Sequence, residues 1–167
     1  MKVLAVASRY VGNKELYGNK FIDDPKIIGD LGELIKKAGQ NDGEAWCAYF
    51  AEAMFAEAYP EKVLWLRKYF SASAVKTHEA FVKAGIQSHM IPKAGDLMIM
   101  QRYEKGLKSW QGHAGIVEKV NADGSWISIE GNTNNGGSRE GDGVYRKHRK
   151  NQRTENGLNL LGFLTLI

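Results

Sequence analysis

Cys47 is the only cysteine in the chain and lies in the stretch GEAWCAYFAEAMF, residues 43–55. A lone thiol is either a small hydrophobe in a core or a nucleophile. Only the thiolate attacks carbonyl groups well, and a free thiol with a pKa of about 8.5 is mostly protonated at neutral pH. A nucleophilic Cys47 therefore needs a helix N-terminus or an imidazolium beside it. The core interpretation rests on the apolar residues at helical spacing from Cys47, namely Phe50 or Ala51, Met54 and Ala58.

His113 and Glu130 are the residues that could activate such a thiol. His113 lies in GHAGIV, where flanking glycines leave the imidazole uncrowded. Glu130 lies in the alternating stretch SWISIEGN, residues 125–132. If the turn signal Asn-Ala-Asp-Gly at 121–124 makes these strands neighbours, His113 and Glu130 lie near the same end of a hairpin. The carboxylate would then hold the imidazole tautomer, and the three residues fit a nucleophile, a base and an orienting group.

The first half of the chain has the apolar spacing of helices. Helices are expected at about residues 25–38, 43–59, 61–70 and 73–84. The cap of the second helix falls between Asn41 and Gly43, which places Cys47 about one to one and a half turns into the helix. Because the helix dipole fades over that distance, His113 is expected to carry most of the activation of the thiol.

The second half changes to short apolar or alternating runs that are typical of strands. Strands are expected at 96–100, 113–120, 125–130, 143–146 and 158–167, with turn residues between them. Helices followed by antiparallel strands predict an α+β domain in which the helices pack on one face of the sheet. Since the chain shows neither an internal repeat nor a long linker, a single domain over residues 1–167 is expected.

Composition narrows the classes of function. The net charge is +4, which mildly favours anionic partners such as cell wall, nucleic acid or lipid surfaces. A single cysteine excludes an internal disulfide framework and any cysteine-rich zinc site. No stretch approaches the roughly 20 apolar residues that span a bilayer, so no membrane insertion is expected. MKVLAVASRY has too few apolar residues for a signal peptide, so we expect synthesis in the cytoplasm and another route for any action outside.

The basic run YRKHRKNQR, residues 145–153, has two interpretations. It is a solvated charged loop before the last strand, or it binds an anionic wall polymer or a nucleic acid. Without interleaved aromatic residues or a known nucleic-acid module, nucleic-acid binding is not expected. Trp110 and Trp126 could flank a cleft that holds a sugar or a peptide, or pack in the core. His78, His89 and His148 lack ligand spacing, so no zinc site is expected.

Four motifs in order resemble the CHAP domains, cysteine- and histidine-dependent amidohydrolases and peptidases related to the NlpC/P60 enzymes. They are WCAYF, PKAGDLMIM, GHAGIV and IEGNTN. The resemblance runs from about Gly12 to the C-terminal strand. It implies a papain-like α+β fold, with N-terminal helices packed on a C-terminal antiparallel sheet of five to six strands. It also implies hydrolysis of amide bonds in bacterial peptidoglycan.

Carried over by motif, the resemblance implies that Cys47 is the nucleophile and His113 the general base and then acid. Glu130 would orient His113, and Asn132 matches a polar position that assists the site. Asp96, in GDL, is expected to be a turn carboxylate that fixes the start of a strand.

The oxyanion of such a reaction needs at least two donors. The backbone N–H of Cys47 is one, and Gln40 or Asn41 is the candidate for the other, because many relatives carry Gln where this chain has Trp46. Trp46, Trp110 and Trp126 are candidates for substrate contact. No metal or other cofactor is expected, since the residues before Cys47 lack the alternating acidic run of a calcium loop.

The resemblance therefore predicts a monomeric peptidoglycan hydrolase, either an N-acetylmuramoyl-L-alanine amidase or a peptide endopeptidase, that works through a thioester acyl-enzyme. It is similar to phage or prophage lysins and to toxins delivered between bacteria, which act on the wall after release by a pore or a secretion system. Two alternatives remain: a catalytically silent module of the same fold that binds wall fragments or a partner protein, and an enzyme of the fold that acts on another amide or in acyl transfer.

Overall fold

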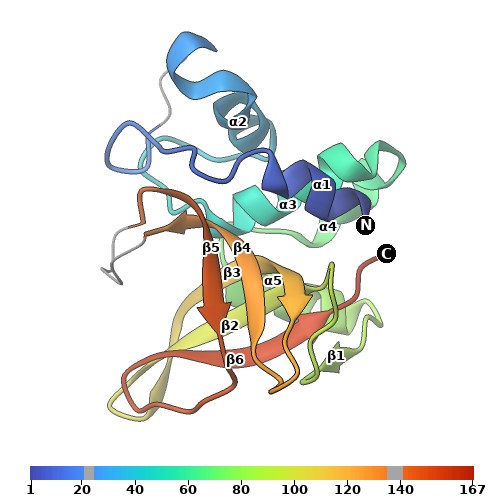
Figure 1. Ribbon diagram of the computed structural model, residues 1–167, viewed down its shortest axis with the longest axis vertical. Coiled ribbons are helices and arrows are strands. Elements are labelled where there is room, and N and C mark those ends of the chain that lie inside the picture. The colour runs from blue at the N-terminus through green and yellow to red at the C-terminus, as the bar shows by residue number, and fades with distance from the viewer. Residues whose placement is uncertain (21–24, 135–140) are drawn as a thin grey trace.

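The computed structural model describes residues 1–20, 25–134 and 141–167, without the side chains of residues 25–30. The chain forms helices first and a sheet second (Figure 1). The helices are α1 (Lys2–Ser8), α2 (Pro25–Lys37), α3 (Cys47–Ala58), the short 3-10 helix η1 (Pro60–Lys62), α4 (Val63–Tyr69) and α5 (Ala74–Lys83). The strands are β1 (Ser88–His89), β2 (Leu97–Glu104), β3 (Leu107–Val120), β4 (Trp126–Thr133), β5 (Gly143–Arg149) and β6 (Gly157–Leu164).

The strands form one antiparallel sheet in the order β1-β6-β2-β3-β4-β5. The predicted α+β architecture, with helices packed against a C-terminal antiparallel sheet, is confirmed. The predicted hairpin is confirmed as well: Ile116 pairs with Ile129, and the turn closes with Asn121 N–H donating to the Ser125 carbonyl at 2.8 Å.

Two predicted boundaries near the site are wrong. The helix that carries Cys47 begins at Cys47, because residues 41–44 form a turn of their own, with Gly43 at a φ of 91° and the Glu44 N–H bonded to the Asn41 carbonyl at 3.1 Å. The strand predicted at 143–146 is too short, because β5 extends to Arg149 and includes the first five residues of the basic run. Helix α1 and the two-residue strand β1 were not predicted.

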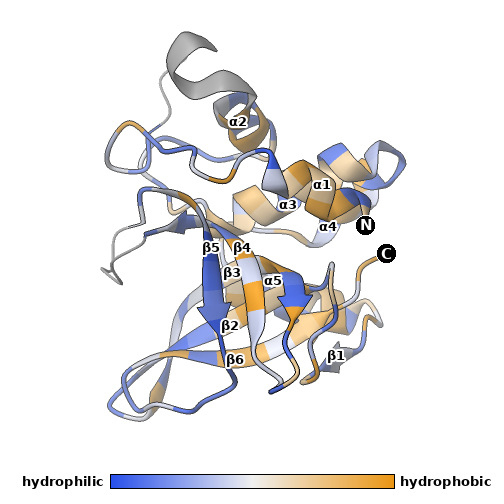
Figure 2. Ribbon diagram, viewed as in Figure 1, coloured by the Kyte–Doolittle hydropathy of each residue, from blue (hydrophilic) through white to orange (hydrophobic). Residues whose placement is uncertain are grey.

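Helix α5 packs directly on β2 and β3, and helix α3 is the element that joins α1, α2 and α4 to the sheet. It contacts β3 and β4 on one side and α1, α2 and α4 on the others. Its packing on β4 depends on Gly131, where an added Cβ would lie 2.6 Å from Cβ of Phe50 and 2.7 Å from the Trp46 ring. A smaller cluster occupies the other face of the strands and comprises Met98, Met100, Val117, Trp126 and Phe163. In Figure 2, α1 and α3 are largely apolar, whereas the arrow of β5 is hydrophilic.

Among the described residues, no helix combines the length and the apolar composition that crossing a membrane requires.

Candidate active site

Cys47 is the first residue of α3, and its thiol is almost completely buried, with 6% of the residue exposed. The prediction that it lies more than a turn inside the helix is therefore wrong, and the helix N-terminus acts on the thiol directly. Burial raises the pKa of the Cys47 thiol, but the hydrogen bond and charge of His113 and the backbone N–H groups of Ala114 and Ala48 lower it by more. The result is a pKa below the ordinary thiol range, which favours the thiolate.

His113 lies on β3 with its imidazole between the thiol and Glu130. Its Nε2 is 2.8 Å from Oε2 of Glu130, so Nδ1 is the ring nitrogen left to face Cys47. Burial lowers the pKa of His113, but the charge of Glu130 and the contact with Cys47 raise it to about 10. A lowered thiol pKa beside a raised imidazole pKa favours a thiolate–imidazolium pair at neutral pH.

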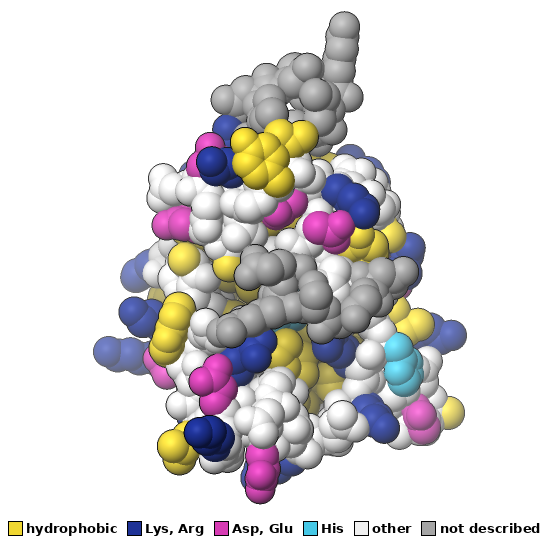
Figure 3. Space-filling model, turned by 90° about the vertical axis from the view of Figure 1, so that its left-hand side faces the viewer, with side chains coloured by type: hydrophobic (Ala, Val, Ile, Leu, Met, Phe, Trp, Pro, Cys, Tyr) yellow, Lys and Arg dark blue, Asp and Glu magenta, His cyan; other side chains and the backbone are white. Residues whose placement is uncertain are grey.

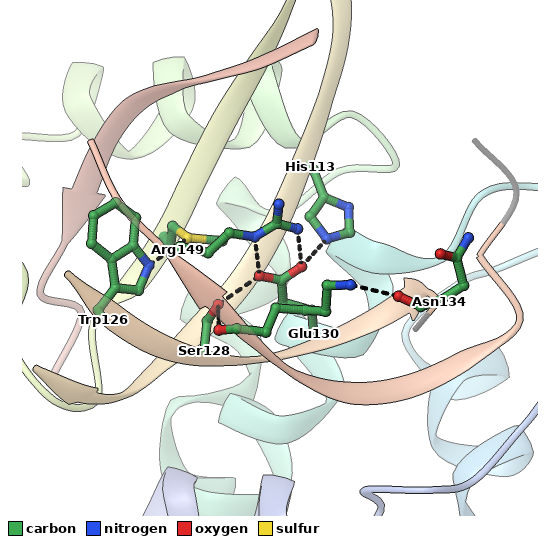
Figure 4. A network of polar contacts seen from close by, with 8 residues as sticks. His113, Trp126, Ser128, Glu130, Asn134 and Arg149 are labelled. Atoms are coloured by element: carbon green, nitrogen blue, oxygen red, sulfur yellow. Dashed lines mark hydrogen bonds and ion pairs between the residues drawn. The ribbon is translucent and has the colours of Figure 1, made fainter. Parts of the chain in front are cut away.

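Glu130 accepts hydrogen bonds on both carboxylate oxygens (Figure 4). Oε1 accepts from the Ser128 hydroxyl at 2.5 Å and from Nε of Arg149 at 2.9 Å. Oε2 accepts from His113 and from a second Arg149 nitrogen at 2.6 Å. Burial raises the pKa of Glu130, but Arg149 and His113 lower it to about 2. Glu130 is therefore a fixed anion that orients the imidazole and does not take up its proton.

Gly115 makes room for this carboxylate. A Cβ at Gly115 would lie 2.7 Å from Cγ of Glu130, so the Glu130 side chain crosses the strand at the place where β3 has no side chain. His113 is two residues away on the same face of β3. The glycine next to the histidine motif thus lets Glu130 reach the imidazole.

Arg149 is the site residue that the sequence analysis missed. It is the last residue of β5, pairs with Trp126 of β4, and lies on the same strand face as Ser128 and Glu130. Alternation within 145–149 was the available signal, but the predicted strand ended at Arg146. The boundary at Arg146 left the side chain that fixes Glu130 outside the predicted strand.

Asn132 lies beside the start of α3. One orientation of its amide gives every polar atom a partner. In this orientation the oxygen accepts from the Trp46 backbone N–H at 3.0 Å, and the nitrogen donates to Oδ1 of Asn19 and to the Gly141 carbonyl, each at 3.1 Å. Its backbone is left-handed, with a φ of 51°. These contacts indicate that Asn132 fixes the residue before the nucleophile; its predicted assistance to the site stays a prediction.

The two candidates for the second oxyanion donor differ in availability. The amide nitrogen of Gln40 donates to the carbonyls of Asn19 at 2.9 Å and Glu44 at 3.1 Å, which uses both of its hydrogens. Gln40 therefore has no amide hydrogen left for an oxyanion, and its predicted role stays a prediction. Asn41 is exposed in the turn and stays a candidate. The Cys47 N–H lies in the first turn of α3, where N–H groups lack intrahelical acceptors, and it stays the first candidate donor.

The three candidate tryptophans separate by burial. Trp46 is fully buried and donates from Nε1 to Oε2 of Glu15 at 2.6 Å, and Trp126 is fully buried against Met98 and Phe163. Neither offers a surface to a substrate, so the predicted substrate contact is wrong for both. Trp110 is 78% exposed on β3 and stays a candidate.

The remaining polar candidates have structural contacts. Asp96 accepts from the Lys93 N–H at 2.8 Å and from the Thr165 hydroxyl at 2.6 Å, which confirms its predicted role at the start of β2. His78 bonds Ser88 and His148 bonds Ser125, in separate places. Within the described part of the chain, no group of three or more His, Cys, Asp or Glu side chains is arranged to hold a metal ion.

Comparison with known proteins supplies the family. The family model described as CHAP domain matches residues 39–132, which is more than half of the chain and includes Cys47, His113, Glu130 and Asn132. Arg149 lies beyond the matched segment. A comparison with curated proteins gives no match. The order of the motifs, the α+β fold and the matched segment agree, and the chain belongs to the CHAP domain family, which is generally associated with amidases and peptidases of peptidoglycan.

Proposed function

We propose that the chain is a cysteine hydrolase that cleaves an amide bond of bacterial peptidoglycan, as an N-acetylmuramoyl-L-alanine amidase or a peptide endopeptidase. The observation that carries the proposal is the buried chain of contacts from Cys47 through His113 to Glu130, with 2.8 Å between His113 Nε2 and the carboxylate. Each group has a partner that favours the charge state needed for nucleophilic catalysis.

The mechanism begins with the thiolate–imidazolium pair. The Cys47 sulfur attacks the peptide carbonyl carbon, and the N–H groups at the start of α3 stabilise the developing oxyanion. As the C–N bond breaks, His113 gives its proton to the leaving amine, which leaves a thioester on Cys47. Neutral His113 then takes a proton from water, the hydroxide attacks the thioester, and the acid product leaves with the thiolate restored.

Glu130 serves both halves of this cycle without changing its own protonation. Its pKa of about 2 keeps the carboxylate ionised over the range in which His113 gains and loses a proton. An imidazole whose Nε2 is held by a fixed anion directs Nδ1 at the reacting atoms throughout. The same anion stabilises the imidazolium formed at rest and again during attack by water.

Substrate access is proposed from the face seen in Figure 3, where apolar side chains line a hollow flanked by Lys and Arg side chains. The net charge of +4 favours an anionic polymer such as the cell wall. Trp110 is the exposed aromatic residue that we assign to contact with sugar or peptide, because its ring offers a large apolar surface close in sequence to His113.

The biological setting follows from this substrate. We assign the protein, acting as a monomer, to hydrolysis of the wall from the periplasm or from outside the cell, as a phage or prophage lysin or as a toxin delivered between bacteria.

The alternative function is that of a catalytically silent CHAP-fold module that binds wall fragments or a partner protein. Near-complete burial of Cys47 and His113, 6% and 8% exposed, favours that alternative, whereas the complete set of reactive groups favours the enzyme.

Digestion of purified sacculi tests the proposal directly. Wild type is expected to release soluble fragments, and Cys47→Ser to release none, because a serine hydroxyl is not ionised by His113 under the same conditions. Mass spectrometry of the fragments identifies the bond: a new terminus at L-alanine means an amidase, and one within the peptide means an endopeptidase.

Two outcomes would contradict the proposal. Failure of wild type to release fragments from sacculi of every wall chemotype would reject peptidoglycan hydrolysis. Equal release by wild type and Cys47→Ser would reject Cys47 as the nucleophile. Binding of wild type to sacculi without any release would support the silent module.

A further inference from the structure

The Arg149–Glu130 pair differs from the exposed ion pair that Arg146 makes with Glu118 on the same strand. Arg149 uses two nitrogens on the two oxygens of a carboxylate that is fully buried, at 2.9 and 2.6 Å. Ser128, also fully buried, adds a bond at 2.5 Å to one of these oxygens. Among the described residues, three of the four hydrogen bonds on Glu130 thus come from groups other than His113, and they fix the carboxylate plane (Figure 4).

We propose that Arg149 is a positioning residue that acts through Glu130, holding its carboxylate so that Oε2 faces Nε2 of His113. The inference rests on the proposed role of His113 and extends the site onto β5, beyond the segment that the family model matches. A carboxylate bonded by His113 alone would be free to turn about its side-chain bonds. The guanidinium fork removes that freedom, because its two parallel bonds match both oxygens at once.

The charged groups around Glu130 define what a pH measurement reports. They are Cys47 at the start of α3, His113 on β3 and Arg149 on β5, while Lys147 of β5 is bonded to the Asn134 carbonyl. Positioning and charge have different signatures. If orientation is lost, the imidazolium is no longer held beside the sulfur, and the thiolate is lost at a higher pH. If only the positive charge of Arg149 is lost, Glu130 attracts the imidazolium more strongly, which raises the pKa of His113 and leaves the acid limb, which the thiol sets, near its wild-type position.

Arg146 provides a matched control in the same strand. It makes a bidentate pair with Glu118 at 2.8 Å, on the exposed side of β5. Arg146→Met removes the same side chain, charge and type of pair without touching Glu130. Any effect specific to Arg149→Met must therefore come from the carboxylate that Arg149 holds.

The experiment measures alkylation of Cys47 by iodoacetamide against pH, by mass spectrometry of the intact folded protein. Because the chain has one cysteine, every alkylation event reports Cys47. Arg149→Met is expected to move the acid limb of the profile up by about one pH unit, which lowers the thiolate population about tenfold below that limb. Arg149→Lys is expected to move it in the same direction by less, since lysine restores the charge but not the fork. Arg146→Met is expected to match wild type.

A double-mutant cycle gives the decisive comparison. Glu130→Gln is expected to slow alkylation, and Arg149→Met is expected to add nothing in that background, because Arg149 acts only through Glu130. Three outcomes would each overturn the proposal. The two substitutions could slow alkylation multiplicatively, the acid limb of Arg149→Met could move to lower pH, or the profile of Arg149→Met could equal that of Arg146→Met. If Arg149→Met does not fold, judged by circular dichroism, the same comparisons with Arg149→Lys decide it.

The assay also separates this inference from the proposed function. Alkylation needs no substrate, so a normal Arg149 effect with no digestion of sacculi would reject the substrate class and leave the positioning role standing. Digestion of sacculi by wild type, together with an alkylation profile of Arg149→Met equal to that of wild type, would support the substrate class and reject the positioning role.

Discussion

At the scale of the residue, the reactivity of Cys47 depends on two neighbours, the first turn of α3 and His113. A helix N-terminus contributes about 0.3–1 kcal/mol to a nearby anion, which is less than one pKa unit. The hydrogen bond and charge of His113 must therefore supply most of what overcomes the burial of the thiol. His113 is therefore still expected to contribute most to the lowered thiol pKa, although Cys47 lies directly at the start of the helix.

His113→Ala is accordingly expected to return the thiol pKa to the alkaline range, because burial then acts without the imidazolium. Alkylation of Cys47 at pH 6–7 should fall at least about tenfold, and hydrolysis of sacculi should be lost. In wild type the reactive pair exists above the lowered thiol pKa and below the His113 pKa of about 10, so activity should fall on both sides of that window.

His148→Ala serves as the control, since the His148 ring bonds only the Ser125 hydroxyl among its described hydrogen bonds, at 3.0 Å. It should leave the alkylation profile unchanged. An unchanged profile in His113→Ala would instead mean that His113 does not set the thiol pKa.

At the scale of the element, the sequence was most informative where one local signal decides the outcome. The turn at 121–124 and the alternation around it were enough to pair β3 with β4 and so to bring His113 near Glu130. The start of α3 was misplaced because Asn41 and Gly43 are good caps by type yet are used in their own turn. Arg149 was missed because its partner lies on another strand, and only the register of β5 against β4 brings it there.

The contact between α3 and β4 leads to a prediction about Gly131. In Gly131→Ala the new methyl group would overlap Phe50 and Trp46, so α3 must shift away from the strand and carry Cys47 with it. We expect a loss of about 1–3 kcal/mol in the free energy of unfolding, as for other overpacked cores. Urea denaturation measures the stability, and the rate of thiol alkylation at pH 7 measures the displacement of Cys47.

Gly124→Ala is the matched control for this substitution. Its cost comes from a φ of 80° in the β3–β4 turn, with no heavy atom within 4 Å of the added Cβ. It should lower stability and leave alkylation unchanged in the folded protein. If Gly131→Ala lowers stability but alkylates like wild type, α3 does not transmit the packing of β4 to the thiol.

At the scale of the whole molecule, two buried carboxylates act on stability in opposite pH ranges. The pKa of Glu130, held at about 2, lies below its unfolded value, so its contribution is present above about pH 4 and is lost as the pH falls through 2. Glu52 behaves in the opposite way. Burial against α4 outweighs the charge of Arg67, 3.8 Å away, and raises the pKa of Glu52 to about 7.

Glu52→Gln is therefore expected to stabilise the protein at pH 8. The folded pKa of about 7 exceeds the unfolded value of about 4.3, so between these values the folded state binds more protons and stability falls as the pH rises. Replacing the carboxylate by an amide removes that loss, by about 1–3 kcal/mol at pH 8, and the advantage should vanish below about pH 4. Urea denaturation of both proteins at pH 4, 6 and 8 measures this difference in stability.

Glu57→Gln is the control on the exposed face of the same helix, where Glu57 lies 3.9 Å from Arg9. It should change stability little at any of these pH values. A constant difference between wild type and Glu52→Gln across the three values would show that the pKa of Glu52 is the same in the folded and unfolded states. The charge of Arg67 would then offset the burial of Glu52. Arg67 also holds the last turn of α2, because it donates to the Lys37 carbonyl at 2.9 Å.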